Sequence, residues 1–136
     1  MTRIYTLVNQ KGGVGKTTTA INLGAYLAKL DQRVLIVDID PQANATSSLG
    51  VEKNSVSTST YDALLSGDVP ASSILFNERL QLSLLPSSPA LAGAEVELVE
   101  EEGREFRLRD ALESFKGKYD YILIDCPPSL GLLTVN

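Results

Sequence analysis

One glycine-rich stretch near the N-terminus constrains the fold of this chain more than any other feature. Residues 9–19 read N-Q-K-G-G-V-G-K-T-T-T, after a β-prone run at residues 4–8 and before a segment with helical periodicity. Glycines allow backbone N–H groups to approach a phosphate closely, and the start of a helix adds partial positive charge at the same point. The stretch therefore predicts a phosphate-binding loop between a strand and a helix.

Two side chains of this loop have expected roles of their own. Lys16 is expected to reach the β- and γ-phosphates of a nucleotide as a point charge, and the Thr17 hydroxyl is expected to ligate Mg²⁺. The alternative is a glycine-rich turn with two solvated lysines. The strand before the loop and the helix after it favour the specific phosphate-binding motif.

Length and composition limit the remaining possibilities. The chain has 136 residues, enough for one domain with a hydrophobic core, and 43% of them are hydrophobic, which is ordinary for a globular protein. No run approaches the ~20 apolar residues that span a bilayer, and the N-terminus shows no signal-peptide pattern. We therefore expect one cytoplasmic domain, residues 1–136, without membrane association.

The residues that are rare or absent narrow the chemistry. The sequence has no histidine, which excludes histidine metal sites and histidine general bases. The single cysteine, Cys126, fits a reducing cytosol and is expected to be a small buried residue rather than a nucleophile. The formal net charge of −5 gives no obvious nucleic-acid patch on the chain as a whole. DNA binding through a localised patch, or through residues beyond this chain, stays open.

β-prone runs and helical segments alternate along the chain, which predicts a P-loop NTPase-like, doubly wound α/β fold with a mostly parallel sheet. Gly24 is expected to let the first helix pack closely on this sheet. Strands are expected at residues 4–8, 34–37, 80–85 and 119–124, and helices at 17–30, 61–65, 72–76, 91–101 and 104–115.

The end of the chain suggests an incomplete sheet. Another helix is expected to start at residues 130–135, where the last apolar segment has little to pack against. We therefore expect the chain to be the N-terminal portion of a longer protein. The alternative is a complete minimal domain.

Three aspartates follow expected strands. Asp38 and Asp40 come after the apolar run at 34–37, and Asp125 ends the strand at 119–124. Open α/β sheets place their ligand chemistry at the carboxyl ends of strands. An apolar strand that ends in aspartate is the Walker B arrangement, so Asp125 is expected to support Mg²⁺, commonly through a water.

The other two aspartates have two candidate roles each. Asp40 is the candidate for orienting the attacking water, and its alternative role is to form a turn before Pro41. Asp38 either supports Mg²⁺ through an intervening ligand or caps the end of its strand. The sequence favours neither role over the other.

Four segments together resemble the Soj/ParA chromosome-partitioning ATPases of the ParA/MinD superfamily. They read N-Q-K-G-G-V-G-K-T-T-T-A-I-N-L, V-D-I-D-P-Q-A-N-A-T-S-S-L-G, L-A-G-A-E-V-E-L-V and Y-D-Y-I-L-I-D-C-P-P-S-L-G-L-L. Gln10 takes the place of the first glycine of the general pattern G-x-x-x-x-G-K-[ST], and Lys11 with two glycines resembles the deviant P-loop of this superfamily. The segment D-P-Q-x-N-x-T favours the partitioning branch over the division-site branch.

The resemblance implies an ATPase with ATP and Mg²⁺ as cofactors and with Lys11, Lys16 and Asp40 as catalytic residues. It implies that ATP joins two protomers, with Lys11 of each reaching the nucleotide of the other and Gly12 near the interface. The implied nucleotide-binding residues are consecutive: Lys11, Gly12, Gly13, Val14, Gly15, Lys16, Thr17 and Thr18. The implied metal set is Thr17, Asp125 and Asp38.

The resemblance also implies partners. The ATP-bound homodimer would bind DNA without sequence preference, so it would be cytoplasmic and nucleoid-associated, and a ParB-type centromere-binding protein would stimulate hydrolysis. Members of the family are longer, and their second half carries the basic residues that touch DNA. Two alternatives stay open: a nucleotide-binding module without full activity, and a related deviant P-loop ATPase for division-site placement or replication control.

Overall fold

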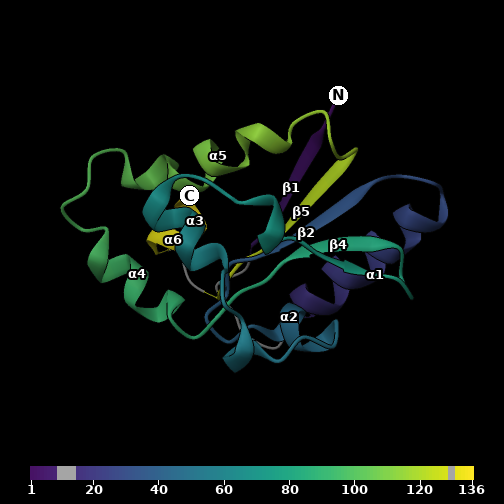
Figure 1. Ribbon diagram of the computed structural model, residues 1–136, viewed down its shortest axis with the longest axis horizontal. Coiled ribbons are helices and arrows are strands. Elements are labelled where there is room, and N and C mark those ends of the chain that lie inside the picture. The colour runs from purple at the N-terminus through teal and green to yellow at the C-terminus, as the bar shows by residue number, and fades with distance from the viewer. Residues whose placement is uncertain (9–14, 129–130) are drawn as a thin grey trace.

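The computed structural model describes residues 1–8, 15–128 and 131–136. Its centre is a five-stranded sheet in the order β1-β5-β2-β4-β3 (Figure 1). Neighbouring strands are parallel except β3 and β4, so the sheet is mostly parallel, as the sequence predicts. The strands are β1 Arg3–Leu7, β2 Val34–Asp38, β3 Leu75–Asn77, β4 Leu82–Leu85 and β5 Tyr121–Asp125.

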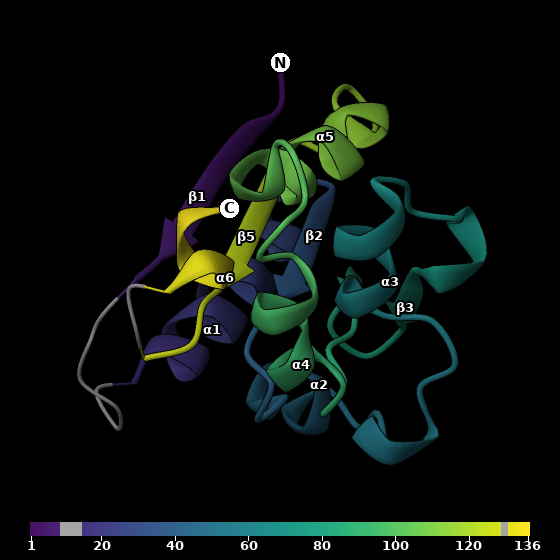
Figure 2. The same ribbon diagram turned by 90° about the vertical axis from the view of Figure 1, so that its left-hand side faces the viewer.

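Helices cover both faces of the sheet. On one face lie α1 Lys16–Lys29 and α2 Asn44–Ser48, and on the other lie α3 Thr60–Ser66, α4 Leu91–Glu97, α5 Arg107–Leu112 and α6 Leu132–Val135. Short 3-10 helices span Lys53–Ser55, Ala71–Ser73, Arg104–Phe106 and Glu113–Phe115. Figures 1 and 2 both show β1, β5 and β2 side by side. Within the described residues, no helix has the length and apolar character needed to cross a membrane.

Alternate residues of the strands enter two separate cores. Ile36 and Leu123 belong to the core beneath α1, whereas Leu35 and Ile122 belong to the core beneath α3, α4 and α5. All five residues of β2 are buried. A parallel strand covered on both faces needs a continuous apolar run, and this is why residues 34–37 are apolar without alternation.

Helix α1 approaches the sheet closely at Gly24. A methyl group at this position would lie 3.2 Å from Ile36 Cδ1 and 3.4 Å from Leu82 Cδ2. The missing side chain therefore sets the distance between α1 and the sheet, and the expected close packing is confirmed.

Several expected elements differ from those observed. The prediction of a helix at 72–76 is wrong. β3 occupies the second half of this range and pairs with β4, with Leu75 opposite Leu84. The Asn77 side chain accepts the Leu80 N–H at 2.9 Å and closes the turn between these strands. Helix α2 was not predicted from the sequence. The helix expected at 91–101 ends at Glu97. The helix expected at 104–115 is α5, flanked by two 3-10 turns.

Candidate functional site

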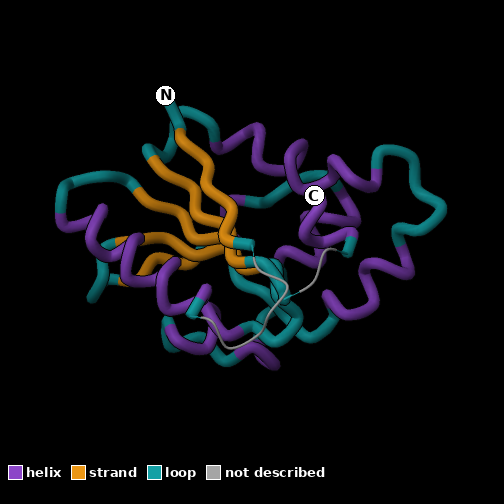
Figure 3. Tube along the Cα trace, turned by 180° about the vertical axis from the view of Figure 1, so that it is seen from behind, coloured by secondary structure: helices purple, strands orange, loops and turns teal. Residues whose placement is uncertain are grey.

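The ends of two strands and the start of one helix meet at the carboxyl edge of the sheet (Figure 3). β2 and β5 are parallel and in register, so Asp38 lies opposite Asp125. Gly15 precedes α1 with φ +82°, a left-handed conformation that favours glycine. The fold thus brings the strand-end aspartates and the first turn of α1 to one place.

Thr17 and Asp125 are in direct contact. The Thr17 hydroxyl donates a hydrogen bond to Asp125 Oδ2 at 2.6 Å, which joins the first turn of α1 to the end of β5. The other oxygen, Asp125 Oδ1, is buried and has no hydrogen-bond partner within the described residues. A buried carboxylate oxygen without a donor suits a cation or a water bound to one. These two residues therefore fit a Mg²⁺ site.

Burial dominates the electrostatics of Asp125. Desolvation raises the pKa of its carboxyl, and the hydrogen bond from Thr17 and the positive charge of Lys16 lower that pKa. The negative charge of Asp40 raises the same pKa. Lys16, Asp40 and Asp125 therefore interact although they come from three separate segments, and a cation bound here would reduce the repulsion between the two carboxylates.

Asp40 lies two residues beyond the end of β2 and is 5% exposed. Its Oδ1 accepts the backbone N–H of Gln42 at 3.0 Å, a hydrogen bond typical of aspartate at the start of a turn. Asp40 therefore has the turn-forming role that was its alternative in the sequence analysis. Its negative charge also raises the pKa of Asp125.

Asp38 is fully buried, and both of its carboxylate oxygens accept hydrogen bonds. Oδ1 accepts the Asp40 N–H at 3.1 Å, and Oδ2 accepts the Thr46 N–H at 2.9 Å and the Thr46 hydroxyl at 2.7 Å. Burial raises the pKa of this carboxyl to about 7 against the opposing effect of these hydrogen bonds. Because both oxygens bind groups of the protein, the geometry favours the strand-end role over support of a metal.

Cys126 is buried, as expected. Desolvation raises the pKa of its thiol to about 12, so the nucleophilic thiolate is disfavoured at neutral pH.

The expected phosphate-binding loop is described only in part. Lys11, Gly12, Gly13 and Val14 lie outside the described residues. The other four are Gly15, Lys16, Thr17 and Thr18, of which Lys16 and Thr17 are half-buried and Gly15 and Thr18 are exposed.

Two hydroxyl side chains of this edge were missed by the sequence. Thr46 donates to Asp38 and Ser87 donates to the backbone carbonyl of Asp40 at 2.6 Å. Serine and threonine are common in loops, so neither residue stands out. The one available signal was the P-S-S-P run at 86–89, which directly follows an expected strand and therefore lies at the same edge of the sheet.

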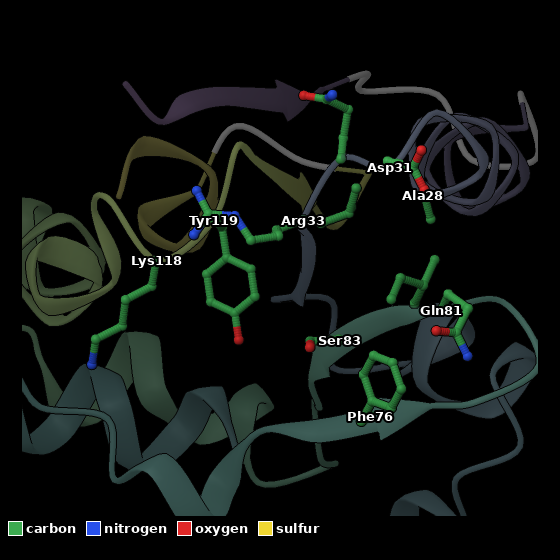
Figure 4. A pocket seen from close by; sticks show the side chains of 11 residues that line it. Ala28, Asp31, Arg33, Phe76, Gln81, Ser83, Lys118 and Tyr119 are labelled. Carbon is green, nitrogen blue, oxygen red and sulfur yellow. The ribbon is translucent and has the colours of Figure 1, made fainter.

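A separate cavity of about 370 Å³ lies at the opposite end of the sheet (Figure 4). Among its lining residues are Arg33 and Tyr119, which precede β2 and β5, and Phe76 of β3. Asp38 and Asp125 are the last residues of β2 and β5, whereas Arg33 and Tyr119 precede these strands. This cavity is therefore not part of the candidate site.

A doubly wound sheet, a glycine before the first long helix and a strand-end aspartate beside a helical threonine define the P-loop class of α/β proteins. Comparison with known proteins agrees with this class. Residues 2–136 match a family described as the AAA domain, and the chain belongs to this family.

Curated relatives confirm the resemblance to the Soj/ParA proteins. The chain is 56% identical to the chromosome partitioning protein ParA of Myxococcus xanthus, over 98% of this chain and 47% of that protein. It is 55% identical to the sporulation initiation inhibitor protein Soj of Bacillus subtilis and 50% identical to the chromosome-partitioning ATPase Soj of Treponema pallidum. These matches cover 100% of this chain and 54% and 53% of the two relatives. The chain thus spans about half the length of the curated relatives it matches.

A solved structure confirms the fold. The structure of cobyrinic acid a,c-diamide synthase from Mycobacterium smegmatis, with a bound ATP analogue and magnesium, matches with a TM-score of 0.96. The two sequences are 43% identical, and the match covers 100% of this chain and 55% of the other.

Proposed function

We propose that this chain forms the part of a chromosome- or plasmid-partitioning ATPase that binds the phosphates and Mg²⁺. The contact between Thr17 and Asp125 carries the proposal, because it joins the hydroxyl and the carboxylate that a nucleotide-bound Mg²⁺ needs. The high identity to proteins named ParA and Soj supports the partitioning role.

Four side chains have separate roles in phosphate binding, Mg²⁺ binding and hydrolysis. Lys16 and the N-terminus of α1 attract the β- and γ-phosphates. The Thr17 hydroxyl and Asp125 bind Mg²⁺, which when bound neutralises charge on the phosphates. Asp40 orients the water that attacks the γ-phosphate.

The remaining parts of the proposal rest on the family. Lys11 acts across an ATP-dependent homodimer, and Gly12 lies near its interface. The dimer binds DNA without sequence preference through the part of the relatives that this chain does not match, which places it on the nucleoid in the cytoplasm. A ParB-type protein stimulates hydrolysis.

Another activity is named in the matched Mycobacterium smegmatis structure, a cobyrinic acid a,c-diamide synthase. Identity to that protein is 43%, against 56% and 55% for the ParA and Soj relatives, and this difference favours partitioning.

Calorimetric titration with Mg-ATP tests the phosphate-binding part. We expect the wild-type chain to bind, and Lys16→Ala to bind about 100-fold more weakly, because a hydrogen bond to a charged group contributes up to ~3 kcal/mol. Lys29→Ala, at the other end of the same helix, is the matched control and should bind like the wild type. Equal affinity of all three chains, or no binding by a folded wild type, would contradict the proposed site.

Hydrolysis separates an ATPase from a module that only binds nucleotide. Asp40→Ala is expected to keep Mg-ATP affinity within about threefold and to lose turnover, because orientation of water acts on the chemical step rather than on binding. Phosphate release at saturating Mg-ATP is the measurement. Unchanged turnover in Asp40→Ala would exclude this residue, and binding without any turnover in the wild type would favour the nucleotide-binding module.

A further inference from the structure

A buried polar cluster lies behind the candidate hydrolytic aspartate. It consists of Asp38, Asp40, Thr46, Thr60 and Ser87, and we refer to it as the Ser87 cluster. Each member is at most 5% exposed. Its residues come from the end of β2, from α2, from the start of α3 and from the loop after β4.

Both backbone polar groups of Asp40 are bound within this cluster. Its N–H donates to Asp38 Oδ1 at 3.1 Å. Its carbonyl oxygen accepts the Ser87 hydroxyl at 2.6 Å and also the Ala43 N–H of the following turn at 2.8 Å. The peptide units on both sides of Asp40 Cα are therefore tied to buried groups, and this fixes the direction in which the Asp40 side chain leaves the backbone.

Thr46 joins these two anchors. Its hydroxyl donates to Asp38 Oδ2 at 2.7 Å and accepts the Ser87 N–H at 2.9 Å. Asp38 thus contacts the N–H of Asp40, Ser87 contacts its carbonyl oxygen, and Asp38 and Ser87 are linked to each other through one threonine oxygen.

Thr60 adds a support from α3. Its hydroxyl donates to the Asp38 carbonyl at 2.8 Å, and its N–H donates to the Pro86 carbonyl at 2.9 Å. The ends of β2 and β4 are therefore bridged by the start of α3. The polar groups of the Ser87 cluster named above are hydrogen-bonded to one another or to the backbone. The cluster therefore supports Asp40 and is not itself a ligand site.

We propose that Ser87 and Thr46 are positioning residues that fix Asp40 for hydrolysis. The expected effect of these residues on turnover rests on the proposed ATPase function. Their expected effect on the structure of the turn at Asp40 does not. A misplacement of about 1 Å in a group that acts on the reacting atoms can reduce a rate about 100-fold. Loss of one of several buried anchors is expected to reduce it by roughly 10-fold.

The primary test variant is Ser87→Ala, which removes the side-chain donor to the Asp40 carbonyl and leaves the Ala43 N–H donor in place. Thr46→Val removes the bridging hydroxyl with little change in shape, and Thr46→Ser keeps that hydroxyl. Ser73→Ala is the matched control, because the Ser73 hydroxyl is buried and has no hydrogen-bond partner in the described part of the chain.

The first measurement is amide hydrogen exchange and needs no enzymatic activity. Ser87→Ala and Thr46→Val should speed exchange of the Asp40 amide at least fivefold relative to the Leu123 amide in β5, which reports global unfolding. Thr46→Ser and Ser73→Ala should leave this ratio unchanged. An unchanged ratio in a folded Ser87→Ala chain would overturn the proposal whatever the enzyme does.

The second measurement is Mg-ATP turnover. Ser87→Ala and Thr46→Val should lower kcat roughly 10-fold with KM within about twofold of the wild type, and Thr46→Ser should restore kcat. Faster exchange at Asp40 with kcat unchanged would overturn the positioning role. A wild type without turnover would contradict the proposed ATPase function instead. The exchange ratio of the Asp40 and Leu123 amides would then still test whether Ser87 and Thr46 hold the backbone of Asp40.

Discussion

Burial raises the pKa of the Asp38 carboxyl. Its pKa is raised to about 7 in the folded chain, whereas an aspartate in the unfolded chain has a pKa near 4. Between these values the unfolded chain has released the proton and the folded chain retains it. The stability therefore falls as the pH rises from about 4 to about 7, and below about pH 4 this cost disappears.

Replacing Asp38 with asparagine should flatten this pH dependence. Each unit of pKa difference corresponds to about 1.4 kcal/mol, so we expect the free energy of unfolding of the Mg²⁺-free wild type to fall across this window by a few kcal/mol more than that of Asp38→Asn. Urea unfolding at several pH values from about 4 to about 8 measures the difference. Asp31→Asn, at an exposed position, controls for the loss of a charge. Parallel curves for wild type and Asp38→Asn would refute this account of Asp38.

At the scale of elements, the distance between α1 and the sheet depends on Gly24. A side chain here would press on Ile36 and Leu82, and α1 carries Lys16 and Thr17 at its N-terminal end. Overpacking at this contact would move the helix that presents the phosphate-binding residues.

Gly24→Val should therefore destabilise the chain by about 1–3 kcal/mol, the usual cost of overpacking a close contact. The midpoint of urea unfolding measures this cost. Asn22→Val places the same β-branched residue at an exposed position of the same helix and should change the stability by less than about 1 kcal/mol. Equal effects of the two variants would mean that helix propensity, and not the contact with Ile36, decides the outcome.

At the scale of the molecule, the described sheet has an open apolar edge. β1 is its first strand, and Ile4 and Tyr5 on β1 are 40% and 48% exposed. Tyr26 of the neighbouring helix α1 is 63% exposed. An exposed edge strand with apolar side chains is a template for pairing with another chain.

We therefore expect this 136-residue chain to self-associate with rising concentration whether or not nucleotide is present. Ile4→Lys should weaken the association, because a charge on an edge strand opposes pairing. Sedimentation velocity over a range of concentrations is the measurement. Phe76→Lys, on the opposite edge strand β3, is the matched control. If both variants weaken association equally, general apolar exposure and not the β1 edge is responsible.

The sequence by itself determined the mostly parallel sheet and the residues that end its strands. A strand, a glycine-rich turn and a helix are local features, so Gly15, Lys16 and Thr17 could be placed at the start of α1 from spacing alone. The apolar runs before Asp38 and Asp125 likewise predicted buried parallel strands, because a strand covered on both faces is apolar along its whole length.

Only the tertiary structure decided which of these residues touch. The pairing of β3 with β4 replaced an expected helix, because hydrogen bonds between strands depend on a partner segment that local propensity does not register. The Ser87 hydroxyl reaches Asp40 across 47 residues of sequence, and the Thr17 hydroxyl reaches Asp125 across 108. Contacts over such separations follow from the order and register of the strands, so the fold, and not the spacing of residues, brings these groups together.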